Sequence, residues 1–177
     1  GWPPQRKSPF PIRRPMSLVF EEMIAAPIQL VFELFTDLPH AAEHVQSIQQ
    51  LDVIGKGPVG KGTRFRVTRL MFGKQATEEL EITAFDPPRS YRVEAVARGA
   101  QTTTIYRFEG GQRETRVVTE VTSRPLSPMA KLMNPLVGAA RKRSVTKAML
   151  LDHADLKRVA EARVAALAAA QDGDLPA

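Results

Sequence analysis

The chain of 177 residues contains no cysteine, and 43% of its residues are apolar against 25% charged. This is the composition of a soluble globular domain. The lack of cysteine excludes a disulfide framework, a thiol nucleophile and thiolate-held zinc or iron–sulfur clusters. No apolar run approaches the about 18 residues of a membrane-spanning helix, so we expect no membrane span. The absence of cysteine fits a reducing cytoplasm, which is the location that we expect.

The net charge of +6 is concentrated at the N-terminus. Residues 1–15 hold four basic side chains and no acidic one, which leaves +2 for the remaining residues. A nucleic-acid-binding domain concentrates positive charge on its folded surface, so we expect no nucleic-acid partner. The same fifteen residues include five prolines and predict a flexible arm, either an extension at the start site or an interaction arm. A single domain over 16–170 and a disordered tail over 171–177 are expected to follow.

The domain opens with a strand and two short helices. Alternating polarity over Ser17–Ala25 predicts the strand. Pro27 suits the first turn of a helix, and an apolar stripe from Ile28 to Phe35 predicts that helix to be amphipathic. Residues 38–48 predict a second short helix beside it.

From Gln49 the hydrophobic period changes to two, which predicts strands joined by short turns. The expected strands are 49–54, 62–71, 75–84, 89–97, 102–109 and 114–123. Six consecutive strands with short connections indicate an antiparallel meander.

Folding the chain at Gly73-Lys74 predicts a register for one hairpin. Val67 then faces Leu80, Phe65 faces Ile82, and Arg69 lies opposite Glu78 on the same apolar face. Two interpretations of this pair are open. It is either a polar anchor for a ligand or an ion pair at the wet hairpin tip, which contributes about 1 kcal/mol or less.

The next hairpin, folded at Gly99-Ala100, pairs Tyr91 with Phe108 and Val93 with Tyr106. Its inner face therefore carries two tyrosines on neighbouring strands. A tyrosine there can donate a hydrogen bond to a ligand while its ring packs against apolar groups, or it can simply fill the core.

A long C-terminal helix is predicted to begin at Ser127-Pro128, with a kink at Pro135 or a break that Asn134 re-caps. A curved sheet with one apolar face needs a cover, and a single helix leaves space between itself and the sheet. That space is a natural cavity for an apolar ligand.

The segments "SLVFEEMIAAPIQLVFELFTDLPHAAEHVQSI", "GPVGKGTRFRVTRLMFGKQATEELEITAFDPPRSY" and "TTTIYRFEG" resemble the START-like, or SRPBCC, superfamily. The resemblance extends over about residues 17–150, and its nearest part is the polyketide cyclase/dehydrase and lipid transport group. It implies an α+β helix-grip fold, in which about seven antiparallel strands wrap around a long C-terminal helix. It also implies a cavity for hydrophobic molecules.

Candidate ligand contacts come from the inner face of the sheet and from the C-terminal helix. They are Phe65, Val67, Leu80, Ile82, Tyr91, Val93, Thr104, Tyr106, Phe108, Met133, Leu136 and Val137. The catalytic candidates, should any chemistry occur, are Tyr106, His44, Arg69 and Glu78.

Histidines and basic residues complete the candidates. His40 and His44 have a spacing that can ligate a metal, but no third ligand is evident, so we expect no metal and no cofactor. His153 lies in a charged helical stretch and is expected to be solvated. Residues 141–143 with Lys147 form a basic patch, which is either a solvated face or a contact for an acidic partner or a membrane surface.

The sequence therefore predicts a domain that binds or carries a small hydrophobic or amphipathic molecule. Two alternatives are open: an enzyme that cyclises or dehydrates a polyketide-like substrate, and a protein-interaction module that uses the basic helix.

Overall fold

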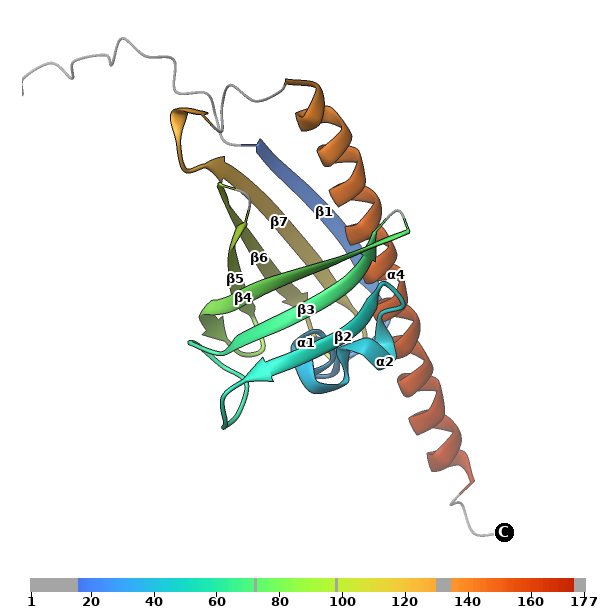
Figure 1. The fold of residues 1–177 in the computed structure, drawn as a ribbon. Coiled ribbons are helices and arrows are strands. Elements are labelled where there is room, and N and C mark those ends of the chain that lie inside the picture. The colour runs from blue at the N-terminus through green and yellow to red at the C-terminus, as the bar shows by residue number, and fades with distance from the viewer. Residues whose placement is uncertain (1–15, 72, 98, 130–134, 174–177) are drawn as a thin grey trace, which may run out of the picture.

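The computed structural model describes residues 16–71, 73–97, 99–129 and 135–173 (Figure 1). The predicted arm, 1–15, lies outside these residues, as do 174–177 of the predicted tail. The elements are β1 (Met16–Ile24), α1 (Ile28–Thr36), the 3-10 helix η1 (Leu38–His40), α2 (Ala41–His44), β2 (Ile48–Ile54), β3 (Arg64–Met71), β4 (Lys74–Asp86), β5 (Ser90–Ala97), β6 (Ala100–Gly110), β7 (Thr115–Pro125) and α4 (Pro135–Asp172).

The seven strands form one antiparallel sheet in the order β1-β7-β6-β5-β4-β3-β2. The meander of β2 to β7 is extended by β1, which pairs with β7, so β1 and β2 form the two edges of an open sheet. Figure 1 shows the sheet curving around α4. The predicted fold class, a helix-grip α+β domain, is confirmed.

The first predicted hairpin register is wrong by two residues. Met71 pairs with Lys74, so the loop is one residue earlier than expected and Gly73 takes its second position with φ 72°. Glycine adopts that left-handed conformation without a steric cost. Arg69 therefore pairs with Ala76, and Glu78 pairs with Val67 and is exposed. The predicted cross-strand pair between Arg69 and Glu78 does not form.

The second hairpin is shifted in the same way. Ala97 pairs with Ala100, and Gly99 has φ 73°. Tyr91 consequently pairs with Tyr106 rather than with Phe108. A shift of two residues keeps each side chain on its face, because side chains alternate with a period of two. The predicted inner faces are therefore correct although the partners are not.

Helix α1 closes the lower end of the curved sheet. The Ile28 amide donates to the Gly111 carbonyl at 2.9 Å, and the Thr115 hydroxyl donates to the Ala26 carbonyl at 2.9 Å. These bonds fix the start of α1 against the β6–β7 turn. Its phenylalanines point into the sheet, where Phe32 meets the ring of Phe108 with centroids 5.2 Å apart.

Helix α4 covers the sheet near its β1 edge. It begins at Pro135, a residue suited to the first turn of a helix. Pro128 and Met129 are helical as predicted, whereas the expected cap Asn134 lies outside the described residues. Val145 and Met149 pack against a cluster from β1 and β7. Within the described residues, no helix combines the length and apolar character needed to span a bilayer.

We predict that Gly110→Ala destabilises the domain. Gly110 has φ 156°, and a Cβ there would overlap the backbone of Glu114, which is the other side of the turn that holds α1. Relief of such an overlap costs about 1–3 kcal/mol of unfolding free energy, measurable by urea denaturation. Gly111→Ala is the matched control, because a Cβ at Gly111 meets nothing within 4 Å. Equal stabilities of the two variants would contradict the prediction.

Candidate functional site

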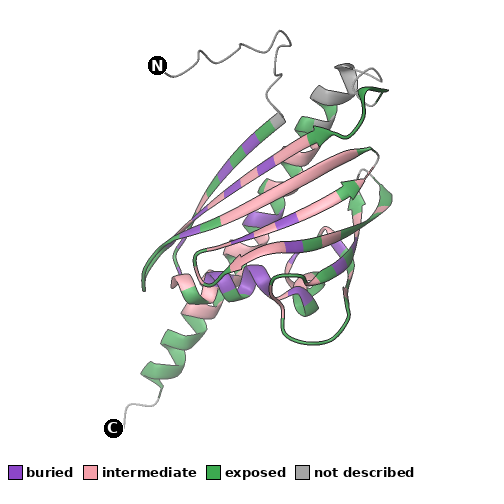
Figure 2. Ribbon diagram, turned by 90° about the vertical axis from the view of Figure 1, so that its left-hand side faces the viewer, coloured by how far each residue is buried: buried purple, intermediate pink, exposed green. Residues whose placement is uncertain are grey.

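Burial changes along the inward positions of β5 and β6: they are buried toward α1 and half-buried toward the opposite end of the sheet, which we call the accessible upper half of the concave face. Figure 2 colours the strands by this burial. On β5 and β6 the inward residues Tyr91, Val93 and Phe108 are buried in the main core with α1. Further along the same strands, the inward residues Ala95, Thr102 and Thr104 are only half-buried. The change occurs at Tyr106, which is also half-buried and packs against the core.

The accessible half exists because α4 covers only part of the sheet. In this region its inward side chains, Val145 and Met149, pack on Leu18, Phe20 and Val121 of β1 and β7. The upper parts of β5 and β6 are left with small or hydroxyl-bearing side chains. The result is a surface on which an apolar guest would meet alanines, threonines and one tyrosine.

A polar cluster lies beside this surface, where β3 meets α4. One Arg69 guanidinium nitrogen (Nη1) donates to Asp152 Oδ2 at 2.5 Å and to Ser47 Oγ at 2.8 Å. Ser47 in turn donates to Asp152 Oδ1 at 2.7 Å. Three segments far apart in the sequence are joined: the turn before β2, strand β3 and helix α4.

This cluster is only partly shielded from water. The Arg69 side chain is 29% exposed and that of Asp152 is 11% exposed. Removing two charges from water costs several kcal/mol per ion, which mutual attraction and added hydrogen bonds must offset. Ser47 adds one hydrogen bond to Arg69 and one to Asp152. Both charged groups therefore have partners, while the Arg69 side chain stays partly accessible to water.

Tyr91 and Tyr106 stack with centroids 4.5 Å apart and an interplanar angle of 10°. Tyr91 is a core residue, whose hydroxyl donates to the Phe35 carbonyl at 3.2 Å. Burial raises the pKa of Tyr106 to about 12, with a further rise from Asp152 and opposing effects from Arg69 and a hydrogen bond with Tyr91. The Tyr106 hydroxyl therefore keeps its proton at neutral pH and can act as a hydrogen-bond donor.

His153 is buried, so the prediction that it is solvated is wrong. Its side chain lies between Phe20 and Phe35, with ring centroids at 6.5 and 5.8 Å. Its Nε2 is 3.2 Å from the Thr119 hydroxyl, and its Nδ1 has no hydrogen-bond partner among the described residues. Burial lowers the pKa of His153, against the opposing influence of Asp152 and Glu22. A neutral imidazole thus lies in the interior, next in sequence to the carboxylate that binds Arg69.

The remaining histidines are placed elsewhere. His44 Nε2 lies 3.8 Å from Asp37 and accepts a hydrogen bond from Arg163 of α4 at 3.3 Å. His40 is exposed and lies 2.8 Å from Asp37. The contact between His44 and Arg163 joins α2 to the lower half of α4, and none of these contacts involves the tyrosines.

The predicted inner-face residues come together as expected on one side of the sheet. Six of them are buried: Phe65, Val67, Ile82, Tyr91, Val93 and Phe108. Leu80, Thr104 and Tyr106 are half-buried. Each has a packing role here, and contact with a ligand stays a prediction. Met133 and the side chains of Leu136 and Val137 lie outside what the structure describes.

Sequence reasoning missed Asp152, Ser47, His153 and Thr119. One signal was present, because the inward stripe of α4, Val145, Met149, Leu156 and Ala160, passes through positions 152–153. A carboxylate and an imidazole inside an apolar stripe indicate a special environment. Their partners, in contrast, lie 105 and 34 residues away and leave no local pattern.

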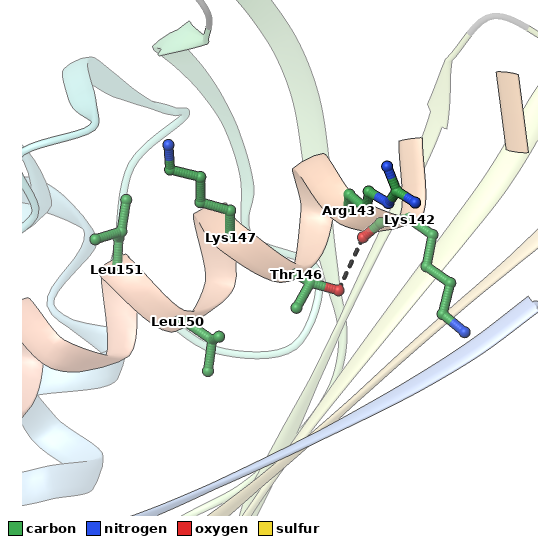
Figure 3. A pocket seen from close by; sticks show the side chains of 6 residues that line it. All are labelled: Lys142, Arg143, Thr146, Lys147, Leu150 and Leu151. Atoms are coloured by element: carbon green, nitrogen blue, oxygen red, sulfur yellow. Dashed lines mark hydrogen bonds between the residues drawn. The ribbon is translucent and has the colours of Figure 1, made fainter. Parts of the chain in front are cut away.

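The described residues also line two hollows outside this surface. One, of about 650 Å³, runs along α4 beside Lys147 and Leu150 (Figure 3). The other, of about 250 Å³, lies in the glycine-rich β2–β3 connection and has mostly polar walls.

A curved antiparallel sheet with a long C-terminal helix and two short helices after the first strand is the helix-grip fold of START-like proteins. Residues 16–168 match the family described as polyketide cyclase / dehydrase and lipid transport, and the chain belongs to that family. No curated protein matches the chain in sequence.

Solved structures share the fold at low sequence identity. The Zhui aromatase/cyclase from Streptomyces sp. R1128 is 16% identical with a TM-score of 0.64, and the alignment covers 84% of this chain and 95% of that one. Major latex-like protein 151 from Panax ginseng is 15% identical with a TM-score of 0.65, covering 82% and 97%. Ara h 8.0201 is 18% identical with a TM-score of 0.60, covering 81% and 98%.

We predict that Arg69 and Asp152 are energetically coupled. Arg69→Met leaves a partly buried carboxylate without its cation, and Asp152→Leu leaves the cation alone. Each change should cost about 1–3 kcal/mol of unfolding free energy, below the range for fully buried pairs because water screens this one. The double variant should lose about 1–2 kcal/mol less than the sum of the two.

Urea denaturation of the four proteins in this cycle measures the coupling. Glu78→Gln is the control, since Glu78 is exposed and lies opposite Val67, and it should change stability by no more than about 0.5 kcal/mol. Additive effects of the Arg69 and Asp152 changes would contradict the prediction.

We also predict that His153 makes the domain sensitive to mild acid. Its pKa is lower in the folded protein than the ordinary 6.5, so stability is complete above pH 6.5 and falls as the pH drops from 6.5 toward the folded-state pKa. His40 acts in the opposite direction, because its hydrogen bond with Asp37 raises its pKa.

The measurement is the urea midpoint of wild type and His153→Gln as a function of pH. Glutamine preserves a polar group toward Thr119 but does not titrate. The difference in urea midpoint between wild type and His153→Gln should become smaller as the pH falls below 6.5, because only wild type loses stability through His153. A constant difference across this range would show that His153 does not carry the effect.

Proposed function

We propose that this protein binds a small hydrophobic or amphipathic molecule on the accessible upper half of the concave face, between β5, β6 and α4. The proposal rests on the fold, the family and the properties of this surface. Many helix-grip proteins use the space between sheet and helix in this way, as the resemblance in sequence implies.

One observation carries the proposal: the concave face is left partly accessible at the point where Tyr106 and the polar cluster lie. A domain built only for stability gains from covering this face with apolar side chains. Here the inward residues become small, namely Ala95, Thr102 and Thr104, where larger ones would fill the space. Small side chains on a half-buried surface leave room for a guest.

The polar groups define the kind of guest. Arg69 keeps 29% of its side chain exposed and would attract a carboxylate or another anionic oxygen. Tyr106 holds its proton and would donate to a carbonyl or hydroxyl oxygen. An apolar molecule with one oxygen-bearing end satisfies both groups, as do fatty-acid-like and polyketide-like compounds.

The second candidate function is cyclisation or dehydration of a polyketide-like substrate at the same surface. The observation that bears on it is the neutral His153, whose Nδ1 has no partner among the described residues; this side chain is only 2% exposed, so it would reach a substrate only if α4 moved. A neutral imidazole is a general base, and positioned bases accelerate proton transfer about 10²–10⁴-fold. Tyr106 is a poor base because its pKa is raised, so its part would be to donate a hydrogen bond.

Native mass spectrometry of freshly purified protein tests for a co-purified molecule. A bound species of lipid-like or polyketide-like mass supports the proposal. A chain that is free of ligand and does not bind an apolar probe contradicts it. Conversion of the recovered molecule on incubation would favour the enzyme.

We predict that Tyr106→Phe weakens binding of the amphipathic anion 8-anilinonaphthalene-1-sulfonate about three- to tenfold, the value of one hydrogen bond. Titration followed by fluorescence measures the dissociation constant. Tyr91→Phe is the comparison variant, because the Tyr91 hydroxyl donates to the Phe35 carbonyl and bears on the ligand surface only through its hydrogen bond with Tyr106. That variant should lose stability and keep its affinity for the probe. Equal affinities of wild type and Tyr106→Phe for the probe would show that the probe does not bind at Tyr106.

A further inference from the structure

The outer face of α4 carries a surface that the proposed ligand site does not use. Six residues line the hollow of about 650 Å³ along this helix: Lys142, Arg143, Thr146, Lys147, Leu150 and Leu151. All six side chains project from α4 (Figure 3). We call this set the basic–apolar face.

This face is distinct from the one that holds α4 to the sheet. Val145 and Met149 pack on β1 and β7, and Asp152 and His153 make the interior contacts. Leu150 and Leu151 lie between these positions in sequence, yet they are 49% and 54% exposed. Two neighbouring leucines that stay half exposed are not needed for the core.

The charge of this part of the helix has one sign. Residues 135–151 contain four basic residues and no acidic one. The first acid, Asp152, is engaged by Arg69. Among the described residues, Lys142, Arg143 and Lys147 make no ion pair, whereas Lys157 further along α4 binds Glu22 at 3.0 Å. The three cations are therefore available to an anionic partner.

Exposed apolar side chains continue beyond the helix at the same end of the molecule. Leu126 and Met129, in the connection between β7 and α4, are 51% and 74% exposed. Figure 1 places residues 126–129 and the first turns of α4 at one end of the domain. Cations and apolar side chains on one end suit a broad surface that is anionic outside and apolar beneath.

We propose that the basic–apolar face docks the protein on an anionic phospholipid bilayer. Lysine and arginine bind the lipid phosphates, and the leucines enter the boundary between headgroups and acyl chains. Charge complementarity and the adjacent leucines favour this occupant over an acidic protein. The docking surface is separate from the concave face. An experiment can therefore disprove membrane docking without disproving the proposed ligand site, and the reverse.

Flotation with vesicles tests the proposal on the full chain. The protein should bind vesicles of phosphatidylcholine mixed with phosphatidylglycerol, and bind phosphatidylcholine alone much more weakly. Added salt should release it, because the attraction is screened. Replacing Lys142, Arg143 and Lys147 together by Gln should weaken binding about a hundredfold, at about fivefold for each charge. Leu150→Ser with Leu151→Ser should also weaken it.

The control replaces an exposed cation and an exposed leucine on the same helix outside the basic–apolar face. Arg158→Gln with Leu167→Ser meets this need, since both side chains are more than half exposed. The control should bind as wild type does, and thermal melting should show that all variants are folded.

Three results would overturn the proposal. The first is equal affinity of wild type for neutral and anionic vesicles, or no binding to either. The second is binding that survives the triple change, which would place the contact elsewhere, for example at the four basic residues of 1–15. The third is a dimer in sedimentation that the leucine changes abolish, which would make a second copy of the chain the occupant.

Discussion

The structure depends on how much of a seven-stranded sheet one helix can cover. A helix is about 10–12 Å wide with its side chains, and strands lie about 4.8 Å apart, so a single helix covers two or three strands. Helix α4 covers β1 and β7 in this way, through Val145 and Met149. The rest of the concave face must be filled by another element or left open. Helix α1 fills the lower half with Phe32 and Phe35, and no described element fills the upper half of β5 and β6.

The link between Arg69 and Asp152 determines how α4 lies across this opening. An apolar residue at position 152 would extend the packing stripe of the helix at no electrostatic cost, whereas a carboxylate there requires its cation. Because Arg69 belongs to β3 and Ser47 to the turn before β2, the pair ties α4 to the side of the sheet opposite β1. The helix is thus held at both edges of the sheet. The surface that we propose as the ligand site lies between the two attachments.

The sequence alone predicts the strands, their inward faces and the helix order, and it misses most of the polar contacts. Alternation has a period of two, so a hairpin shifted by two residues keeps Val67 and Tyr106 inside while Arg69 changes partner. The turn glycines did not reveal the shift, because glycine is suited to either central position of a two-residue turn. Asp152 and His153 were missed for a different reason. Their environment depends on the rotation of α4 against strands that are distant in sequence, and no local pattern encodes that rotation.

The two halves of α4 are held to the domain to different extents, and this difference bears on the proposed ligand site. After Asp152 the helix is held both by apolar packing, with Leu156 and Ala160 in the main core, and by polar contacts. Asp155 accepts from the Gln46 amide, Glu161 accepts from the Ala25 amide, and Lys157 binds Glu22. Before Asp152 the described contacts to the sheet are apolar and come from Val145 and Met149. Segments with few buried contacts open at lower free energy than densely bonded ones. The upper half of α4 therefore separates from the sheet more readily than the lower half, and it borders the accessible part of the concave face. The same half carries the basic–apolar face, so a surface that engaged this face would act on the part of the helix that is easiest to move.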